Sequence, residues 1–365
     1  MLRRDAVTAS PTWPRALSEN EARVVSSLLG ASLESEEGRI REAHVPRTSY
    51  LEAKRRLFEL GVLADRYIPH PDILGTQRVT LLVSRPHSDK MGEVIGMLHR
   101  TPGAINLWSG TQLAFAIVFH RTAEESKSFM TTVGTGVLGS PLTSIQLDPR
   151  EPQFPVFFDF EGAWNHLCNR PGALRYPRPL PGTSRLGIRP RAANRVRDVA
   201  ETLARRPFSF PERGIPPHLL GPAALPREER RLIRDGAVDW RVVLQLDRQI
   251  SYSGRALSSV IFITGKLRPD RTLPGLFHAL GGECGVSPFL LAGEGRSVLA
   301  VGLGTGLGGS SRPSAMALTQ RAVRPTLREY FETFDSVREP MGALRIHRYL
   351  GFCDHDRPAD PGGEE

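Results

Sequence analysis

Cysteine is scarce in this 365-residue chain, which contains only Cys168, Cys284 and Cys353. They lie far apart in the sequence, no CxxC occurs, and an odd number argues against a disulfide framework. No run approaches the ~18 apolar residues of a membrane span. The first residues also lack the apolar stretch of a signal peptide. These absences favour a protein of the reducing cytoplasm without a membrane partner.

Lysine is also scarce. Only four of the 48 basic residues are lysines, and the other 44 are arginines. Against 39 acidic residues this gives a net charge of +9 and an isoelectric point near 10.0. Codon usage in a GC-rich genome can account for part of the arginine excess. Arginine also suits contacts to phosphate and guanine through its planar guanidinium group. The balance therefore indicates either genome composition or a polyanionic partner.

An internal repeat organises the chain. Residues 55–67 (RRLFELGVLADRY) resemble residues 230–242 (RRLIRDGAVDWRV), with two arginines, a leucine and a glycine matching at one constant offset. Further matches follow in the same order, pairing 79–84 (VTLLVS) with 260–265 (VIFITG) and 113–119 (LAFAIVF) with 297–303 (SVLAVGL). This common order indicates a duplication.

Each half of the repeat predicts the same succession of elements: a helical segment, a short hairpin and then a β-α-β-β-α-β unit. The predicted fold is α+β, a tandem of winged helix-turn-helix and ferredoxin-like (βαββαβ) domains. The expected domains are a disordered tail (1–15), a winged helix-turn-helix (16–75), a ferredoxin-like domain (76–148), a proline-rich linker (149–191), a degenerate winged helix-turn-helix (192–250), a second ferredoxin-like domain (251–352) and a tail (353–365).

The first helix-turn-helix pattern lies in residues 35–67. A short helix, a tight turn at His44–Val45 and a longer helix ending at Gly61 follow one another, and the second helix carries an apolar face. The polar leading end of such a helix meets base edges in the major groove. The predicted DNA contacts are Arg47, Thr48, Ser49, Tyr50, Lys54, Arg55 and, in the following hairpin, Arg66. The alternative is an ordinary amphipathic helical pair.

This run resembles the Lrp/AsnC family of bacterial and archaeal regulators, whose recognition helix ends in an Arg-x-x-x-Leu-x-x-x-Gly-Val-Ile pattern. Here the pattern becomes Ala53-Lys-Arg-Arg-Leu57-Phe-Glu-Leu-Gly61-Val62-Leu63, so the family's arginine is replaced by Ala53. The resemblance covers most of residues 16–148 and, more weakly, 192–350. It implies dimers that pair through ferredoxin-like sheets. A tandem chain would form an internal pseudo-dimer or a homo-oligomer.

The second helix-turn-helix is expected to be weakened. Prolines at 216, 217, 222 and 226 interrupt its first helices. Glu228 and Glu229 near the start of its last helix would repel phosphates. This copy is expected to serve packing more than base recognition.

The glycine-rich run 302–311 satisfies GxGxxG through Gly304, Gly306 and Gly309. Because the repeat gives it no βαβ context, a flexible loop that contacts a small-molecule effector, with Ser310, is favoured over a dinucleotide site. The CDHD sequence at 353–356 lacks partners at metal-ligand spacing. No cofactor and no metal are therefore expected.

These patterns predict a transcriptional regulator that binds double-stranded DNA, and not an enzyme. One alternative is an architectural or transcription-machinery-associated protein that binds DNA with little sequence preference. A second alternative is an enzyme like the sirohaem decarboxylases, which resemble Lrp/AsnC proteins and rely on His and Arg residues of the ferredoxin-like sheet. Here His120 lies at a strand end and no histidine lies in the middle of a predicted sheet strand.

Overall fold

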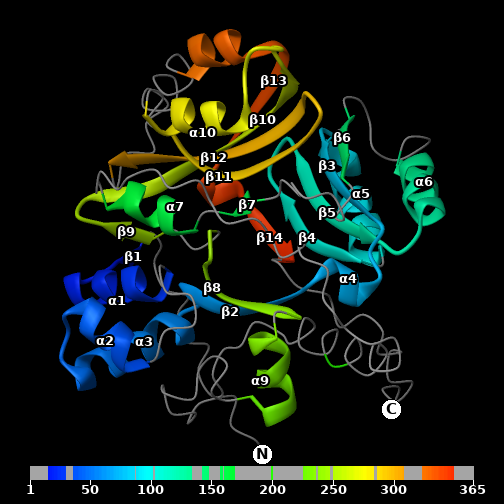
Figure 1. The fold of residues 1–365 in the computed structure, drawn as a ribbon. Helices are drawn as coiled ribbons and strands as arrows, with labels where there is room; N and C mark the ends of the chain where they lie inside the picture. The colour runs from blue at the N-terminus through cyan, green and yellow to red at the C-terminus, as the bar shows by residue number, and fades with distance from the viewer. Residues whose placement is uncertain are drawn as a thin grey trace, which may run out of the picture.

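The protein has an α+β fold in which two ferredoxin-like units stand above a helical end (Figure 1). The computed structural model describes residues 15–29, 36–133, 142–147, 157–168, 199, 225–246, 250–307 and 323–348, apart from 87, 102, 159, 236 and 283–285. The expected tails at 1–15 and 353–365 therefore lie outside the described residues, except Arg15. No described helix is long and apolar enough to cross a membrane.

Three helices form the first helical segment: α1 (Glu19–Leu29), α2 (Glu36–Ala43) and α3 (Arg47–Glu59). α1 begins with a reciprocal cap in which the Ser18 amide donates to Glu21 and the Glu21 amide donates to the Ser18 hydroxyl. After α3 the chain turns at Gly61, whose φ of +66° suits glycine. His44 has a φ of +50° in the tight turn between α2 and α3.

A two-stranded antiparallel ribbon joins the two halves of the repeat. β2 (Leu63–Pro69) pairs along its whole length with β8 (Val238–Leu244), and Arg66 lies opposite Arg241 at the centre. These two arginines occupy equivalent positions in the repeat, so a local two-fold axis passes between them. The short hairpin expected after the long helix, with Arg66 in it, is therefore wrong, because β2 finds its partner in the other half.

The short helix α9 (Arg227–Arg234) precedes β8 just as α3 precedes β2. The repeat is visible in single hydrogen bonds. The Val62 amide donates to the Leu57 carbonyl, and the Ala237 amide donates to the Leu232 carbonyl at the same offset. The same hydrogen bond thus joins helix and strand in both halves.

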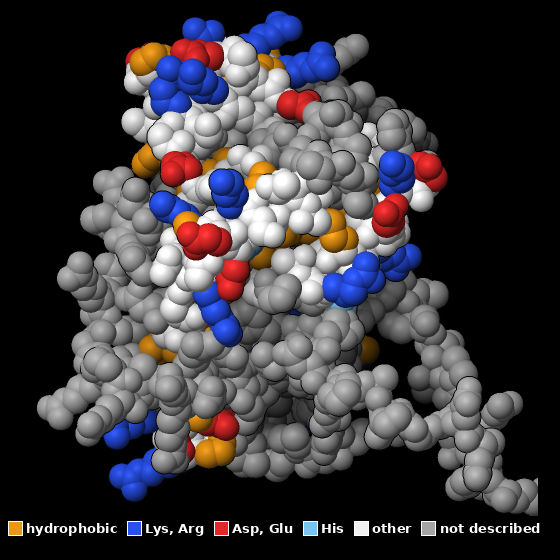
Figure 2. All heavy atoms as spheres, turned by 90° about the vertical axis from the view of Figure 1, so that its right-hand side faces the viewer, with side chains coloured by type: hydrophobic (Ala, Val, Ile, Leu, Met, Phe, Trp, Pro, Cys, Tyr) orange, Lys and Arg blue, Asp and Glu red, His pale blue; other side chains and the backbone are white. Residues whose placement is uncertain are grey.

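The first ferredoxin-like unit is a sheet with the order β4-β5-β3-β6, covered on one face by α5 and α6. α6 lies at the right-hand edge of the molecule in Figure 1, the side that faces the viewer in Figure 2. Its elements are β3 (Arg78–Ser84), α5 (Met91–Arg100), β4 (Ala104–Ser109), β5 (Ala114–His120), α6 (Ala123–Thr132) and β6 (Leu142–Leu147), with the short helices α4 (Pro71–Leu74) and η1 (Ser88–Lys90) beside them.

The second unit repeats this topology with the order β13-β10-β12-β11. Its elements are β10 (Arg255–Leu267), α10 (Leu273–Gly282), β11 (Val286–Glu294), β12 (Ser297–Leu307), a helix over 323–330 and β13 (Phe331–Pro340). The sequence predicts that this last helix continues to 334. Instead it gives way to β13, because pairing with β10 outweighs the local helical pattern.

Each half lends a strand to the other half's sheet. β7 (Phe157–Phe158), from the end of the first half, pairs with β11, while β14 (Arg345–Arg348), from the end of the second half, pairs with β4. The segment 149–191, expected as a linker, thus contains β7 and also α7 (Phe160–Leu167), which packs on β11 and α1. Near α1, β1 (Arg15–Ala16) pairs with β9 (Ile250–Tyr252).

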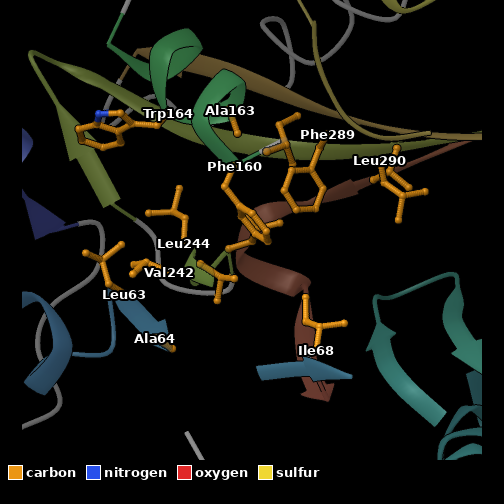
Figure 3. Packing of buried hydrophobic residues seen from close by; sticks show 14 of the residues in the cluster. Leu63, Ala64, Ile68, Phe160, Ala163, Trp164, Val242, Leu244, Phe289 and Leu290 are labelled. Carbon is orange, nitrogen blue, oxygen red and sulfur yellow. The ribbon is translucent and has the colours of Figure 1, made fainter. Parts of the chain in front are cut away.

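The two sheets share one aromatic core. Trp108 of β4 lies with its ring centroid 5.3 Å from that of Phe115, 6.2 Å from Phe262 and 6.1 Å from Phe289. Phe160 of α7 meets Phe289 edge-on at 5.1 Å, as Figure 3 shows. The same view shows Leu63, Val242 and Leu244 of the ribbon below this pair. The core therefore ties the ribbon to both sheets.

Candidate nucleic-acid interface

The leading end of α3 is exposed. Arg47 and Thr48 lie on the surface and Ser49 is half-buried, while α3 packs against α1 through its opposite face. On that face Tyr50, Leu57 and Phe58 are almost completely buried. Backbone N–H groups at a helix start and an adjacent guanidinium are groups that bind phosphates and base edges. The leading end of α3 is therefore accessible to a partner.

Two of the predicted DNA contacts lie inside the protein instead. Tyr50 is fully buried and Lys54 is 2% exposed, with its ammonium group 2.9 Å from a carboxylate oxygen of Glu36. Burial lowers the pKa of Lys54, which Glu36 partly offsets, and burial together with Glu36 raises the pKa of Tyr50. Neither side chain is available to a duplex, so their assignment as contacts is corrected. They fix α3 against α2.

Arg66 is also misplaced by the sequence prediction. It lies in β2, is 5% exposed and donates to the Asp65 carbonyl at 2.8 Å. The hairpin that would have carried it toward the DNA backbone is replaced by the ribbon with β8. Arg66 therefore belongs to the centre of the joint between the two halves.

The exposed arginines of α3 have acidic neighbours that the sequence analysis did not anticipate. Arg47 forms an ion pair with Glu37 of α2, and Arg55 lies 3.8 Å from Glu59 one turn later. All four side chains are 40% or more exposed. Exposed pairs of this kind contribute at most about 1 kcal/mol. A good contact to a base contributes about 1–3 kcal/mol of discrimination, so a duplex can displace Glu37 from Arg47.

α9, the counterpart of α3 in the second half of the repeat, has a different surface. α9 exposes Arg227, Arg230 and Arg231 together with Glu228, and its N-terminal Pro226 carries no side-chain cap. Arg231 lies 3.2 Å from Asp235. The helices expected before α9 lie outside the described residues. α3 and α9 lie on the same side of the molecule, at the end opposite the second sheet (Figure 1).

The glycine-rich run is not a loop where the structure describes it. Gly304 and Gly306 lie within β12, opposite Ser259 and Ala256 of β10. A side chain at Gly304 would meet the Ser259 hydroxyl at 2.7 Å, so the close approach of two strands explains this glycine. The expectation of a flexible loop at Gly304 and Gly306 is therefore wrong, and Gly309 and Ser310 lie outside the described residues.

Within the described part of the chain, no group of three or more His, Cys, Asp and Glu is placed to hold a metal ion. The 353–356 run lies outside it. His120 ends β5 and is buried, with its Nε2 3.0 Å from the Thr80 hydroxyl.

No family model matches this sequence, and no curated protein matches it. Solved structures similar to it include the siroheme decarboxylase NirDL, alone and with an iron-uroporphyrin III analogue; for each, identity is 13%, the TM-score is 0.47, and 91% of this chain and 93% of that chain are covered. A further similar structure, that of MtbAldR, is 19% identical with a TM-score of 0.29, over 36% of this chain and 93% of its own.

These neighbours correct one expectation. The sequence analysis predicts a protein that is not an enzyme, whereas the similar structures that span 91% of this chain are those of a decarboxylase. That expectation is withdrawn. At such identities and TM-scores the likeness carries no conclusion about the activity of this chain.

Proposed function

We propose that this chain is a DNA-binding regulator that inserts the leading end of α3 into the major groove of a duplex. The observation that carries the proposal is the exposure of Arg47 and Thr48 on a helix whose opposite face is anchored by buried Tyr50 and Lys54. A helix held rigidly from behind presents its leading side chains to base edges with little loss of conformational freedom.

The ribbon supports an internal pseudo-dimer with two unlike heads. Its two-fold axis between Arg66 and Arg241 relates α3 to α9, and both helices lie at the same end of the molecule (Figure 1), as the two heads of a dimeric helix-turn-helix protein do. Because the first turn of α9 carries Glu228 and Glu229 whereas that of α3 has no acidic residue, the leading ends of the two helices differ in charge. We expect an asymmetric site in which α3 supplies most of the base contacts.

Binding to a random duplex pool, followed by sequencing of the bound fraction, tests this function. We expect a selected sequence and an affinity that falls steeply with salt. Arg47→Ala should weaken binding to that sequence about tenfold or more. Arg100→Ala, which removes an exposed arginine from α5, is the matched control and should leave the affinity unchanged.

The ion pair between Arg47 and Glu37 allows a second test, in which a substitution should strengthen DNA binding instead of weakening it. Glu37→Gln frees Arg47 and removes a charge that repels phosphate, so it should tighten binding a few fold, whereas Glu93→Gln on α5 should not. Equal binding to selected and random duplexes would favour the architectural alternative. Absence of binding to any duplex at low salt would overturn the proposal.

A further inference from the structure

A cavity of about 350 Å³ lies between α6 and the sheet beneath it, remote from α3. It is lined by Arg78 of β3, Gln146 of β6 and, from α6, Ala123, Ser126, Lys127, Met130 and Thr131. Its size is at the lower end of small-molecule sites. Since a water occupies ~30 Å³, a ligand of up to about ten non-hydrogen atoms fits.

The charge of this cavity has one sign. Arg78 and Lys127 line it, and no Asp or Glu does so among the residues that the structure describes. The nearby Glu125 has its carboxylate 2.6 Å from the Arg121 backbone amide, at the start of α6. Over the whole face in Figure 2, by contrast, positive and negative side chains are interspersed. The cavity is therefore a local site for an anion.

A chain of buried polar groups leads to the cavity wall. The His120 ring nitrogen lies 3.0 Å from the Thr80 hydroxyl, which lies 3.5 Å from the Ser126 hydroxyl. Ser126 is 2% exposed and lines the cavity. Burying three polar side chains in line beneath a helix costs solvation energy that is recovered only through hydrogen bonds. The chain therefore holds Ser126 in place as a polar contact at the floor of the cavity.

In the second half of the repeat, the equivalent position between the helix over 323–330 and β10 lacks these polar groups. The strand registers make Ile261 the counterpart of Thr80 and Gly304 the counterpart of His120. In the helix over 323–330, Val323, Arg324 and Leu327 have the spacing of Ser126, Lys127 and Met130. All three polar groups of the chain are thus replaced by apolar residues or glycine.

The cavity at the counterpart place measures only about 10 Å³. Arg338, the counterpart of Gln146, lines it and donates to the Ser259 hydroxyl at 2.8 Å. The cavity is nearly closed in the second half, whereas in the first half it is open and lined by cationic and hydrogen-bonding side chains. A mere gap between helix and sheet would not explain why the open copy is also the one that holds the polar chain.

We propose that the cavity between α6 and β3 in the first half is a binding site for a small organic anion. Arg78 and Lys127 would attract a carboxylate or phosphate group, Ser126 and Gln146 would hydrogen-bond it, and Met130 with Ala123 would contact a short apolar chain. This site does not depend on DNA binding, and it is distinct from the glycine-rich run considered from the sequence.

The test uses the full chain without DNA and three probes at constant ionic strength: butyrate, inorganic phosphate and uncharged butyramide. Ligand-observed NMR titration should show saturable binding of butyrate, phosphate or both, and little binding of butyramide. The comparison of the two anions distinguishes a carboxylate site from a phosphate site. Butyramide binding as tightly as the anions, or no saturable anion binding up to millimolar concentrations, would overturn the proposal.

Variants locate the site. Lys127→Gln changes an exposed residue and should weaken anion binding about fivefold or more, whereas Lys90→Gln removes the same charge elsewhere and should have no effect. Ser126→Val copies Val323 of the closed counterpart and should abolish binding. If anion binding is equally weakened by Lys127→Gln and Lys90→Gln, it is a property of overall charge and the assignment to this cavity is wrong.

Discussion

Single buried polar residues decide where this structure departs from its sequence pattern. In the sequence, Lys54 lies beside two arginines, and this context predicts a surface residue. In the structure it is buried between α2 and α3, where its ammonium group pairs with Glu36. The partner lies 18 residues away, so neither spacing nor composition reveals it. Arg47 and Thr48, at the leading end of α3, are exposed, although Arg47 also pairs with Glu37 of α2.

His120 provides a test at the scale of one residue. Burial lowers its pKa below the ordinary value of about 6.5, although Glu125 opposes this. The folded state therefore prefers the neutral ring. Above pH 6.5 both states are neutral and the full stability is present. As the pH falls below 6.5 the unfolded state takes up the proton first, so stability falls until the pH passes below the native pKa.

We expect His120→Gln to remove this loss of stability at low pH. The measurement is urea unfolding of both proteins between pH 5 and 8. Burial also lowers the pKa of His347, so the unfolding free energy of both proteins will depend on pH through that residue. Only the difference between the two pH profiles reports on His120. Parallel curves for the two proteins would show that His120 titrates alike when folded and unfolded.

Among the elements, those fixed by local signals agree with the sequence and those fixed by distant partners do not. The turn at Gly61 is present as predicted, and the caps at Ser18 and Thr122 likewise depend only on residues three positions away. β2 was expected as a strand, but its partner was not, because the pairing depends on the axis of the repeat. β13 was missed because its strand character comes from pairing with β10.

The ribbon of β2 and β8 offers a test at this scale. The Trp240 indole N–H donates to a carboxylate oxygen of Asp65 at 3.1 Å across the two strands, and both residues are buried. Trp240→Phe removes this donor while keeping an aromatic ring, so we expect the free energy of unfolding to fall by about 2 kcal/mol.

Trp164→Phe is the matched control, because Trp164 donates to the neutral Ser26 hydroxyl at 2.8 Å outside the ribbon. It should cost less, about 1 kcal/mol, since a hydrogen bond to a charged group contributes more than one to a neutral group. Chemical denaturation of the two variants gives the comparison. An equal or smaller loss for Trp240→Phe would mean that the Asp65 contact does not stabilise the ribbon.

At the scale of the molecule, the sequence predicts the duplication and the α+β fold, since both depend on patterns that recur along the chain. It does not predict how the halves are joined. The exchange of β7 and β14 between the sheets depends on which edges remain open after each unit has folded. The charge of the helical end also differs from expectation, because acidic residues of α2 and α3 lie beside its arginines.

This joint predicts that the two halves hold together without a continuous chain. Beyond the ribbon and the exchanged strands, Glu339 of β13 is fully buried and accepts hydrogen bonds from the Thr111 amide and hydroxyl and from the Gln112 amide, at 2.7 to 3.0 Å. Arg85 and Asp335 form a further ion pair across the halves at 2.8 Å. A carboxylate with three donors, buried between the units, binds them strongly.

We expect a protein with a protease site inserted after residue 180 to remain a single particle after complete cleavage, as size-exclusion chromatography in native buffer would show. Urea should then separate two fragments. Glu339→Ala leaves three donors of the 110–112 turn without their acceptor, so the cleaved variant should separate at lower urea than the cleaved parent. Fragments that part in native buffer would mean that the ribbon and the exchanged strands are too weak to join the halves, and that the placement of α3 relative to α9 depends on chain continuity alone.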